Sequence, residues 1–167
     1  MRSFARCLAF CMAASSAATP AAAVTQSAAV NANVVKPIEL VRMQDLDLGS
    51  ISLTPGSWTA TVGISQAGVL SCANVNLVCS GLAQPAKYQV TGTNKMVVLI
   101  HAPDVTLVNQ SDASKRLTLV PDAPSQIPLP NSGQPGVVFS IGGTITLTGS
   151  IASGDYVGTF NVTAEYQ

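Results

Sequence analysis

The sequence predicts an all-β protein, an antiparallel two-sheet sandwich of the immunoglobulin-like type, on three observations. Almost every segment alternates apolar and polar side chains with a period of two, the pattern of a strand with one buried face. Turn residues interrupt these segments at intervals of roughly 8 to 12 residues. No stretch combines helix caps with a 3.6-residue apolar period over a useful length. These features indicate roughly eight or more short strands in one domain.

The expected strands are rich in β-branched and aromatic residues. They cover residues 58–64, 87–93, 96–100, 105–108, 117–120, 137–147 and 156–166. Gly142 and Gly143 are expected to form a bulge or a bend in the strand that contains them. The segment 121–136 contains five prolines, which cannot donate to a strand ladder, and we therefore predict a loop that crosses between the sheets.

The first 23 residues have the pattern of a secretory leader. Arg2 and Arg6 supply a short positive region, residues 7–18 are apolar or small, and small residues precede a predicted cleavage after Ala23. The apolar stretch is too short to span a bilayer, which needs about 20 residues. We therefore expect an exported protein that passes through the periplasm to the cell surface or the medium.

The charge balance limits the classes of partner. Removal of the leader leaves six Lys and Arg against eight Asp and Glu, a net charge of −2. No basic run is present, so nucleic acid is not an expected partner. Charged residues make up only 10% of the whole chain and hydrophobic residues 47%, which provides a core and leaves much of the surface uncharged. Such a surface suits contact with other copies of the chain.

Cys72 and Cys79 are the two cysteines outside the leader. A close, isolated pair in an oxidising compartment is expected to form a disulfide, with two reduced buried thiols as the alternative. No metal site is expected, because zinc is usually held by four ligands and His101 is the only histidine. No cofactor is expected either.

The last expected strand has one apolar face and one polar face. The apolar face consists of Phe160, Val162, Ala164 and Tyr166. The pattern stops one residue before Gln167, so we expect the edge of this strand to be covered by a segment from elsewhere.

Residues 24–36 are expected to form an extension ahead of a sandwich domain over residues 37–167. The extension alternates and is uncharged up to Val35, and Pro37 marks its end. Its small apolar residues are Ala28, Val30, Ala32 and Val34. A strand of this kind suits addition to an open sheet, where main-chain bonds give affinity and alternate side chains enter pockets.

The C-terminal segment resembles the signature of chaperone–usher pilins, a glycine fourteen residues from the end, alternating apolar residues and a penultimate tyrosine. Here the glycine is Gly154 and the tyrosine is Tyr166. The resemblance implies a sandwich that lacks its last strand. A periplasmic chaperone would first fill the gap, with an outer-membrane usher as a further partner, and the extension of the next subunit would then replace the chaperone. Gly154, Phe160, Val162, Ala164 and Tyr166 would line the groove and face the chaperone, and Ala28, Val30, Ala32 and Val34 would be the donor residues.

Further stretches are similar to a secreted bacterial family, domain of unknown function 4402, which is akin to spore-coat-U-type pilins. They are residues 35–40, 46–51, 142–147 and 154–160. Leu48 stands where this family usually has phenylalanine, a change that a core tolerates. Many pilins join their first two strands by a disulfide, whereas the cysteine pair here would close a local loop.

No set of residues in the sequence forms a catalytic constellation, so we expect no enzyme activity. His101 has no nucleophile placed to use it. Asp45 and Asp47 alternate with leucines, which favours a solvated strand face over a calcium site. Trp58 is expected to anchor the core, with a sugar-stacking platform as the alternative.

Two functions are compatible with these features. The first is a structural subunit of a fimbria-like or other cell-surface assembly, with a role in adhesion, that polymerises by donor-strand complementation. The second is a monomeric secreted sandwich that uses residues 24–35 as its own missing strand. It would bind carbohydrate or protein through Trp58 or the proline-rich loop.

Overall fold

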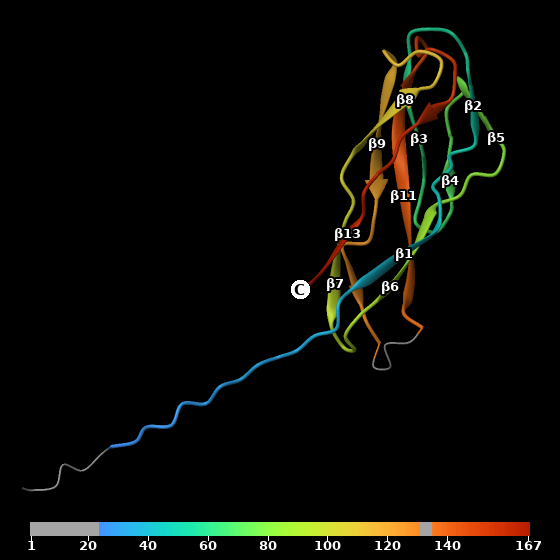
Figure 1. Ribbon diagram of the computed structural model, residues 1–167. Helices are drawn as coiled ribbons and strands as arrows, with labels where there is room; N and C mark the ends of the chain where they lie inside the picture. The colour runs from blue at the N-terminus through green and yellow to red at the C-terminus, as the bar shows by residue number, and fades with distance from the viewer. Residues whose placement is uncertain (1–23, 131–134) are drawn as a thin grey trace, which may run out of the picture. The chain divides into compact units, whose positions relative to one another are not determined.

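The computed structural model describes residues 24–130 and 135–167, and strands are the only long regular elements in these ranges (Figure 1). The predicted all-β class is therefore confirmed. The predicted leader, residues 1–23, and residues 131–134 of the predicted loop lie outside the described residues. The described chain divides into two units at Asn33: residues 24–33 belong to the first, and Val34–Gln167, which contain all the described strands, form the second.

The strands are short, apart from one near the C-terminal end of the domain. In chain order they are β1 (Glu39–Gln44), β2 (Ser50–Leu53), β3 (Thr59–Ile64), β4 (Leu70–Ser71), β5 (Leu77–Ser80), β6 (Ala86–Thr91), β7 (Val97–His101), β8 (Val105–Asn109), β9 (Arg116–Asp122), β10 (Gln126–Pro128), β11 (Val137–Thr148), β12 (Tyr156–Val157) and β13 (Thr163–Tyr166). The described part of the chain contains no helix long and apolar enough to cross a membrane.

The strands form antiparallel sheets. The largest sheet has eight strands, in the order β1-β6-β11-β9-β8-β12, with β3 paired to β11 and β4 paired to β3. A second sheet has the order β10-β7-β13, and β2 and β5 pair with each other. Each strand pair in these sheets is antiparallel. Strand β1 is therefore one terminal strand of the large sheet, and β13 is one terminal strand of the second sheet.

Two clusters of buried side chains hold the sheets together. In the first cluster, β6 and β11 of the large sheet pack against β7 and β10 of the second sheet. In the second cluster, β3, β8, β9 and β11 pack with Leu77 of β5. The rings of Tyr88 and Phe139 stack in the first cluster with centroids 5.9 Å apart, and burial raises the pKa of Tyr88. Apolar burial of this kind is the main stabilising contribution in a sandwich.

Strand β11 runs through both clusters and changes partner midway. Its first half, from Val137 to Ile141, pairs with β6, and its second half, from Gly143 onward, pairs with β3. A Cβ atom on Gly142 would collide with the carbonyl oxygen of Ile64. The glycine pair, where the sequence predicts a bulge or bend, is thus the point where one continuous strand exchanges neighbours.

The prediction of a loop throughout residues 121–136 was wrong. Strand β9 includes Pro121, and β10 lies within the same segment. The pairing between β8 and β9 ends where Val105 faces Leu119, so β9 beyond this point is paired only with β11. A proline is compatible with a strand that has one free side, because its missing N–H leaves no ladder partner unsatisfied there.

The prediction of one continuous strand over residues 156–166 was also wrong. Strand β12 pairs with β8 of the large sheet, whereas β13 pairs with β7 of the second sheet. The chain crosses between the sheets over the intervening residues and cannot keep one ladder partner. Gly158 marks the close approach at the crossing, since a Cβ there would lie 2.7 Å from the carbonyl oxygen of Thr106.

Candidate functional site

An apolar strip lies between β1 and β13, the first and last described strands of the domain. Strand β1 pairs only with β6, and β13 pairs only with β7, so each has one edge without a ladder partner among the described residues. Half-buried side chains from both segments pack on the first core cluster. We define the apolar strip by seven of them: Ile38, Leu40 and Leu46 on the β1 side, and Phe160, Val162, Ala164 and Tyr166 on the β13 side.

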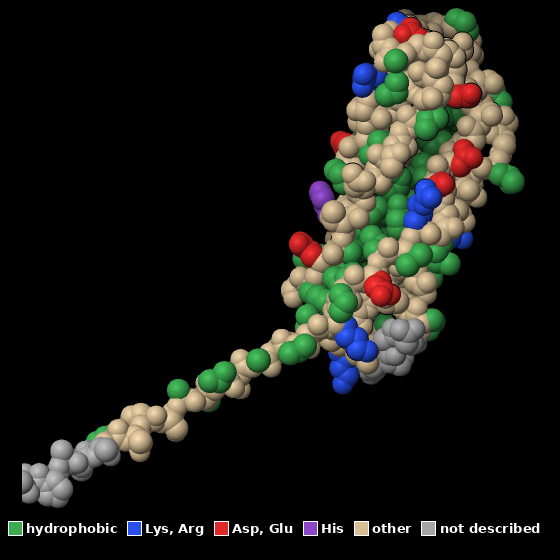
Figure 2. All heavy atoms as spheres, in the orientation of Figure 1, with side chains coloured by type: hydrophobic (Ala, Val, Ile, Leu, Met, Phe, Trp, Pro, Cys, Tyr) green, Lys and Arg blue, Asp and Glu red, His purple; other side chains and the backbone are tan. Residues whose placement is uncertain are grey.

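The strip continues along much of the domain. Leu46 and Phe160 pack against both core clusters, so the strip extends from the first cluster to the second. Figure 2 shows exposed hydrophobic side chains in a band along the face on which β1 and the C-terminal segment lie. An apolar band of this kind, bordered by two unpaired strand edges, is a surface that an added strand would cover.

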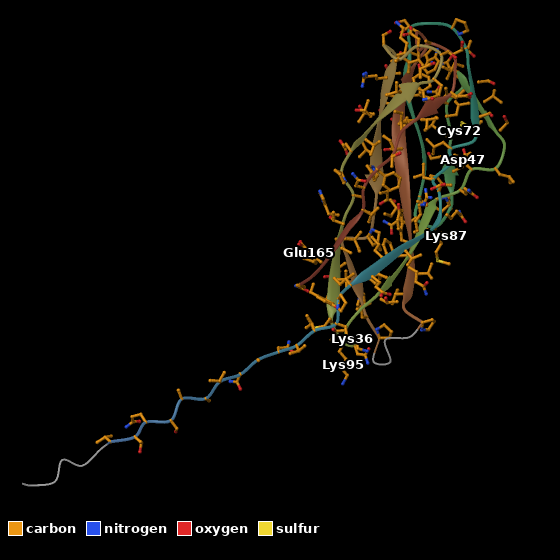
Figure 3. All side chains as sticks on the ribbon, viewed as in Figure 1. Lys36, Asp47, Cys72, Lys87, Lys95 and Glu165 are labelled. Carbon is orange, nitrogen blue, oxygen red and sulfur yellow. A yellow bond between two sulfur atoms is a disulfide. The ribbon has the colours of Figure 1, made fainter. Side chains whose placement is uncertain are left out.

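The side chains of β13 have the alternation that the sequence predicts. Ala164 and Tyr166 are half-buried toward the core, and Thr163 and Glu165 are exposed. Figure 3 shows Glu165 at the margin of the domain. Phe160 and Val162 lie before β13, in the crossing segment, yet pack on the same core. The structure therefore brings four of the five predicted groove residues together.

Tyr166 fastens the last strand to the start of the domain. Its hydroxyl donates a hydrogen bond to the carbonyl oxygen of Lys36 at 2.7 Å and accepts one from the N–H of Thr93 at 2.6 Å. The N–H of Lys36 donates to Oγ1 of Thr93 at 2.6 Å. We call this set of three hydrogen bonds the Tyr166 clamp. Both main-chain hydrogen-bonding groups of Lys36 are engaged in it.

Gly92 makes room for the clamp, and sequence reasoning missed it. A Cβ on Gly92 would collide with the hydroxyl of Tyr166 and would lie 3.0 Å from Cδ1 of Leu129. Lys95 lies in the turn between β6 and β7, and Figure 3 shows Lys36 at the same end of the domain. The one signal in the sequence was a glycine near the end of an expected strand, which often marks the close approach of another group.

Gly154, the fifth predicted groove residue, lies against a buried asparagine. Its backbone has a φ of +138°, and a Cβ there would lie 2.6 Å from Nδ2 of Asn109. Asn109 is only 1% exposed. Its side chain donates to the carbonyl oxygen of Ser153 at 3.0 Å and accepts from the N–H of Ser111 at 2.8 Å. Gly154 thus contributes to a junction between the β8–β9 turn and the segment before β12.

Asp112 lies in the turn that Asn109 holds. The side-chain and backbone hydrogen bonds of Ser114 lower the pKa of its carboxyl group. The side chain is fully exposed, so we assign it only a local role in the conformation of the turn.

Residues 24–33 belong to the first unit, apart from the domain, and contain no strand. All are exposed, and Val30 is 91% exposed. Val34, the last of the predicted donor residues, belongs to the domain unit and is also 91% exposed. The predicted donor residues Ala28, Val30, Ala32 and Val34 are therefore all exposed.

Cys72 and Cys79 form the predicted disulfide, with Cα atoms 6.3 Å apart (Figure 3 labels Cys72). Cys72 follows β4, and Cys79 lies in β5. The bond therefore closes a local loop and also links the β2–β5 pair to the edge of the large sheet. Both sulfur-bearing side chains pack on the second core cluster.

The remaining candidates have ordinary structural surroundings. Asp45 is paired with Arg42 at 2.6 Å, and Asp47 accepts the N–H of Gly49 at 2.8 Å. His101 is exposed at the end of β7. Within residues 24–130 and 135–167, no three His, Cys, Asp or Glu side chains are grouped to hold a metal ion.

Trp58 packs on the second core cluster, and its Nε1 donates to the carbonyl oxygen of Thr54 at 2.7 Å. A shallow hollow beside it is lined by Gly56, Ser57, Thr59, Thr148 and Ser150. The packing and the satisfied indole N–H favour the core-anchor interpretation of Trp58.

The fold and the strip together define an antiparallel β-sandwich domain with two open terminal strands. A model of the family described as domain of unknown function (DUF4402) matches residues 38–166, which is most of the domain unit. The chain belongs to this family. No curated protein and no solved structure matched the chain.

Proposed function

We propose that the protein is a non-enzymatic structural subunit of a fimbria-like or other cell-surface assembly. In this proposal the apolar strip of one copy takes residues 24–35 of a second copy as an added strand. The observation that carries the proposal is the pair of open terminal strands, β1 and β13, on either side of half-buried apolar side chains.

The chemistry of the extension matches the chemistry of the strip. Residues 24–35 contain no charged side chain, so their insertion places no charge in an apolar site. Val30 and Val34 are both 91% exposed in the free chain, and burial of a valine contributes roughly 1.5 kcal/mol or more. The open edges of β1 and β13 offer main-chain hydrogen bonds in addition.

The half-burial of the strip also supports this proposal. Leu40, Phe160 and Tyr166 touch the core yet keep part of their surface exposed. An added strand would complete their burial and remove two sheet edges that would otherwise favour uncontrolled pairing. In this proposal the chain is exported through the periplasm. A chaperone would cover the strip there until the subunit is assembled at an outer-membrane usher.

The experiment compares two double variants of the extension in the full chain. Val30→Asp with Val34→Asp places two charges on the face expected to enter the strip, and Asn31→Asp with Asn33→Asp places the same charges on the opposite face. Each buried charge costs several kcal/mol, so the valine variant should form no series of oligomers that survives mild detergent on a gel. The asparagine variant should form these oligomer ladders normally.

The valine variant should also shorten the ladders of the wild-type chain when the two are mixed, because it accepts a strand but cannot donate one. Equal ladders from both double variants would contradict the proposal, as would a wild-type chain that stays monomeric at every concentration.

A further inference from the structure

The extension belongs to the same chain as the strip that it would fill, which raises a problem of competition. A segment tethered to its own acceptor has an effective concentration near the millimolar range when the geometry permits insertion. Self-closure would then outcompete transfer to a second copy at ordinary protein concentrations. A chain that polymerises by strand donation therefore needs a structural feature that prevents its extension from inserting into the strip of the same chain.

The Tyr166 clamp lies at the position where such a feature would act. Lys36 is the last residue of the predicted extension and directly follows the donor segment 24–35, and β1 begins at Glu39, three residues later. Strand β13 ends at Tyr166, which contacts Lys36 directly. The extension therefore leaves the domain at one end of the apolar strip. To enter its own strip, it would have to reverse direction between Val35 and Ile38 and return alongside β1.

The residues at this position oppose a tight reversal. The favoured two-residue hairpin turns need a positive φ at the first central residue. Pro37 has φ held near −65°, and it pushes the preceding residue, Lys36, into an extended conformation. Neither residue can therefore take the left-handed position of such a turn.

A wider reversal would have to move Lys36 itself. Its N–H is bonded to Oγ1 of Thr93, and its carbonyl oxygen is bonded to the hydroxyl of Tyr166. The same hydroxyl accepts the N–H of Thr93, so the three groups hold one another in place. A wider loop through Lys36 would break at least two of these hydrogen bonds before the extension made any new contact.

We infer that Tyr166 is a positioning residue that prevents self-closure, so that the extension is available only to a second copy of the chain. This inference rests on the proposed function, because it concerns the occupant of the same strip. The clamp holds Lys36, the residue next to the donor segment, in place on the domain and thereby selects an intermolecular acceptor. Tyr166 then has two roles, since its ring lines the strip and its hydroxyl holds the exit of the extension.

The test uses the full exported chain, unfolded with the disulfide intact and refolded at high dilution so that only self-closure can fill the strip. The readout is uptake of a fluorescent synthetic peptide of residues 24–35, measured with the molecular mass. Tyr166→Phe removes the hydroxyl and keeps the ring, and Thr93→Val removes the acceptor for Lys36. Tyr156→Phe is the matched control, because its hydroxyl also donates to a backbone carbonyl, that of Ala152 at 2.8 Å.

We expect the wild type and Tyr156→Phe to remain open monomers that take up the peptide. In Tyr166→Phe and Thr93→Val the extension should insert into the strip of its own chain. The fraction of monomer that does not bind the peptide should then rise roughly five- to tenfold. A merely structural role for the hydroxyl would lower the melting temperature of Tyr166→Phe without changing peptide uptake. That outcome would overturn the inference, as would equal uptake by Thr93→Val and the wild type.

The variant Val30→Asp with Val34→Asp separates the inference from the proposed function. Its own extension cannot enter an apolar strip, so a strip that accepts strands must take up the peptide in this variant. Failure to bind the peptide would overturn the proposed function and the inference with it. If this variant binds the peptide but the wild type does not bind it after dilute refolding, the inference about Tyr166 is overturned and the proposed function stands.

Discussion

The hydroxyl of Tyr166 donates to the carbonyl oxygen of Lys36 at 2.7 Å, across 130 positions of the chain. This bond joins the last strand to the residue at which the extension leaves the domain. The last residue of the family-matched region is thus held against a residue two positions before that region begins.

Gly92→Ala should destabilise the domain through its contact with Tyr166. The new Cβ would collide with the hydroxyl, and overpacking of this kind costs roughly 1–3 kcal/mol. Combination with Tyr166→Phe should relieve part of the collision, so the double variant should lose less stability than the sum of the single variants, by about 1 kcal/mol. Urea unfolding of the four chains measures this coupling. Strict additivity would show that Gly92 does not provide the space for the hydroxyl.

Gly154→Ala should lower the unfolding free energy by about 2 kcal/mol or more, because it adds a collision with Asn109 to a strained backbone. Gly68→Ala is the control, since Gly68 also has a positive φ, +81°, but the nearest atom that its Cβ would meet is Cδ of Pro85, at an ordinary contact distance of 3.8 Å. The difference between the two variants in thermal unfolding isolates the contact with Asn109. Equal melting temperatures of the two variants would show that the contact with Asn109 is not the reason for a glycine at position 154.

Replacement of Cys72 and Cys79 by serine should reduce stability without loss of the fold. A closed loop of about eight residues is worth on the order of 2.5 kcal/mol in the chain-entropy model. The first core cluster contains neither cysteine, so its sheets should persist in the circular dichroism spectrum. Thiol titration of the unfolded wild-type chain without reductant should find no free thiol from this pair. Two free thiols from it would contradict the bond.

Features that depend on local sequence could be predicted. The period-two pattern indicated the strand class, the alternation of Ala164 and Tyr166 indicated the buried face, and the spacing of Cys72 and Cys79 indicated the disulfide. In each case the signal lies within a few residues of the structure that it predicts.

Features that depend on distant partners could not be predicted. Whether Pro121 fits a strand depends on where β8 ends, and whether the last strand is continuous depends on which sheet each half joins. The contact of Gly154 with Asn109 and the clamp on Lys36 involve residues far apart in the chain. No local sequence pattern predicts such pairings, because they are determined by tertiary contacts.

Tyr166→Asp should prevent accumulation of the chain in the periplasm. The substitution removes both hydrogen bonds of the hydroxyl and places a charge on the half-buried face of β13, which costs several kcal/mol unless the charge is paired. Thr163→Asp is the matched control, because it places the same charge on the exposed face of the same strand. Immunoblots of periplasmic extracts should show a large loss for Tyr166→Asp and near-normal amounts for Thr163→Asp. Normal amounts of both variants would mean that neither folding nor chaperone capture uses the apolar face of β13, and the subunit proposal would lose its main support.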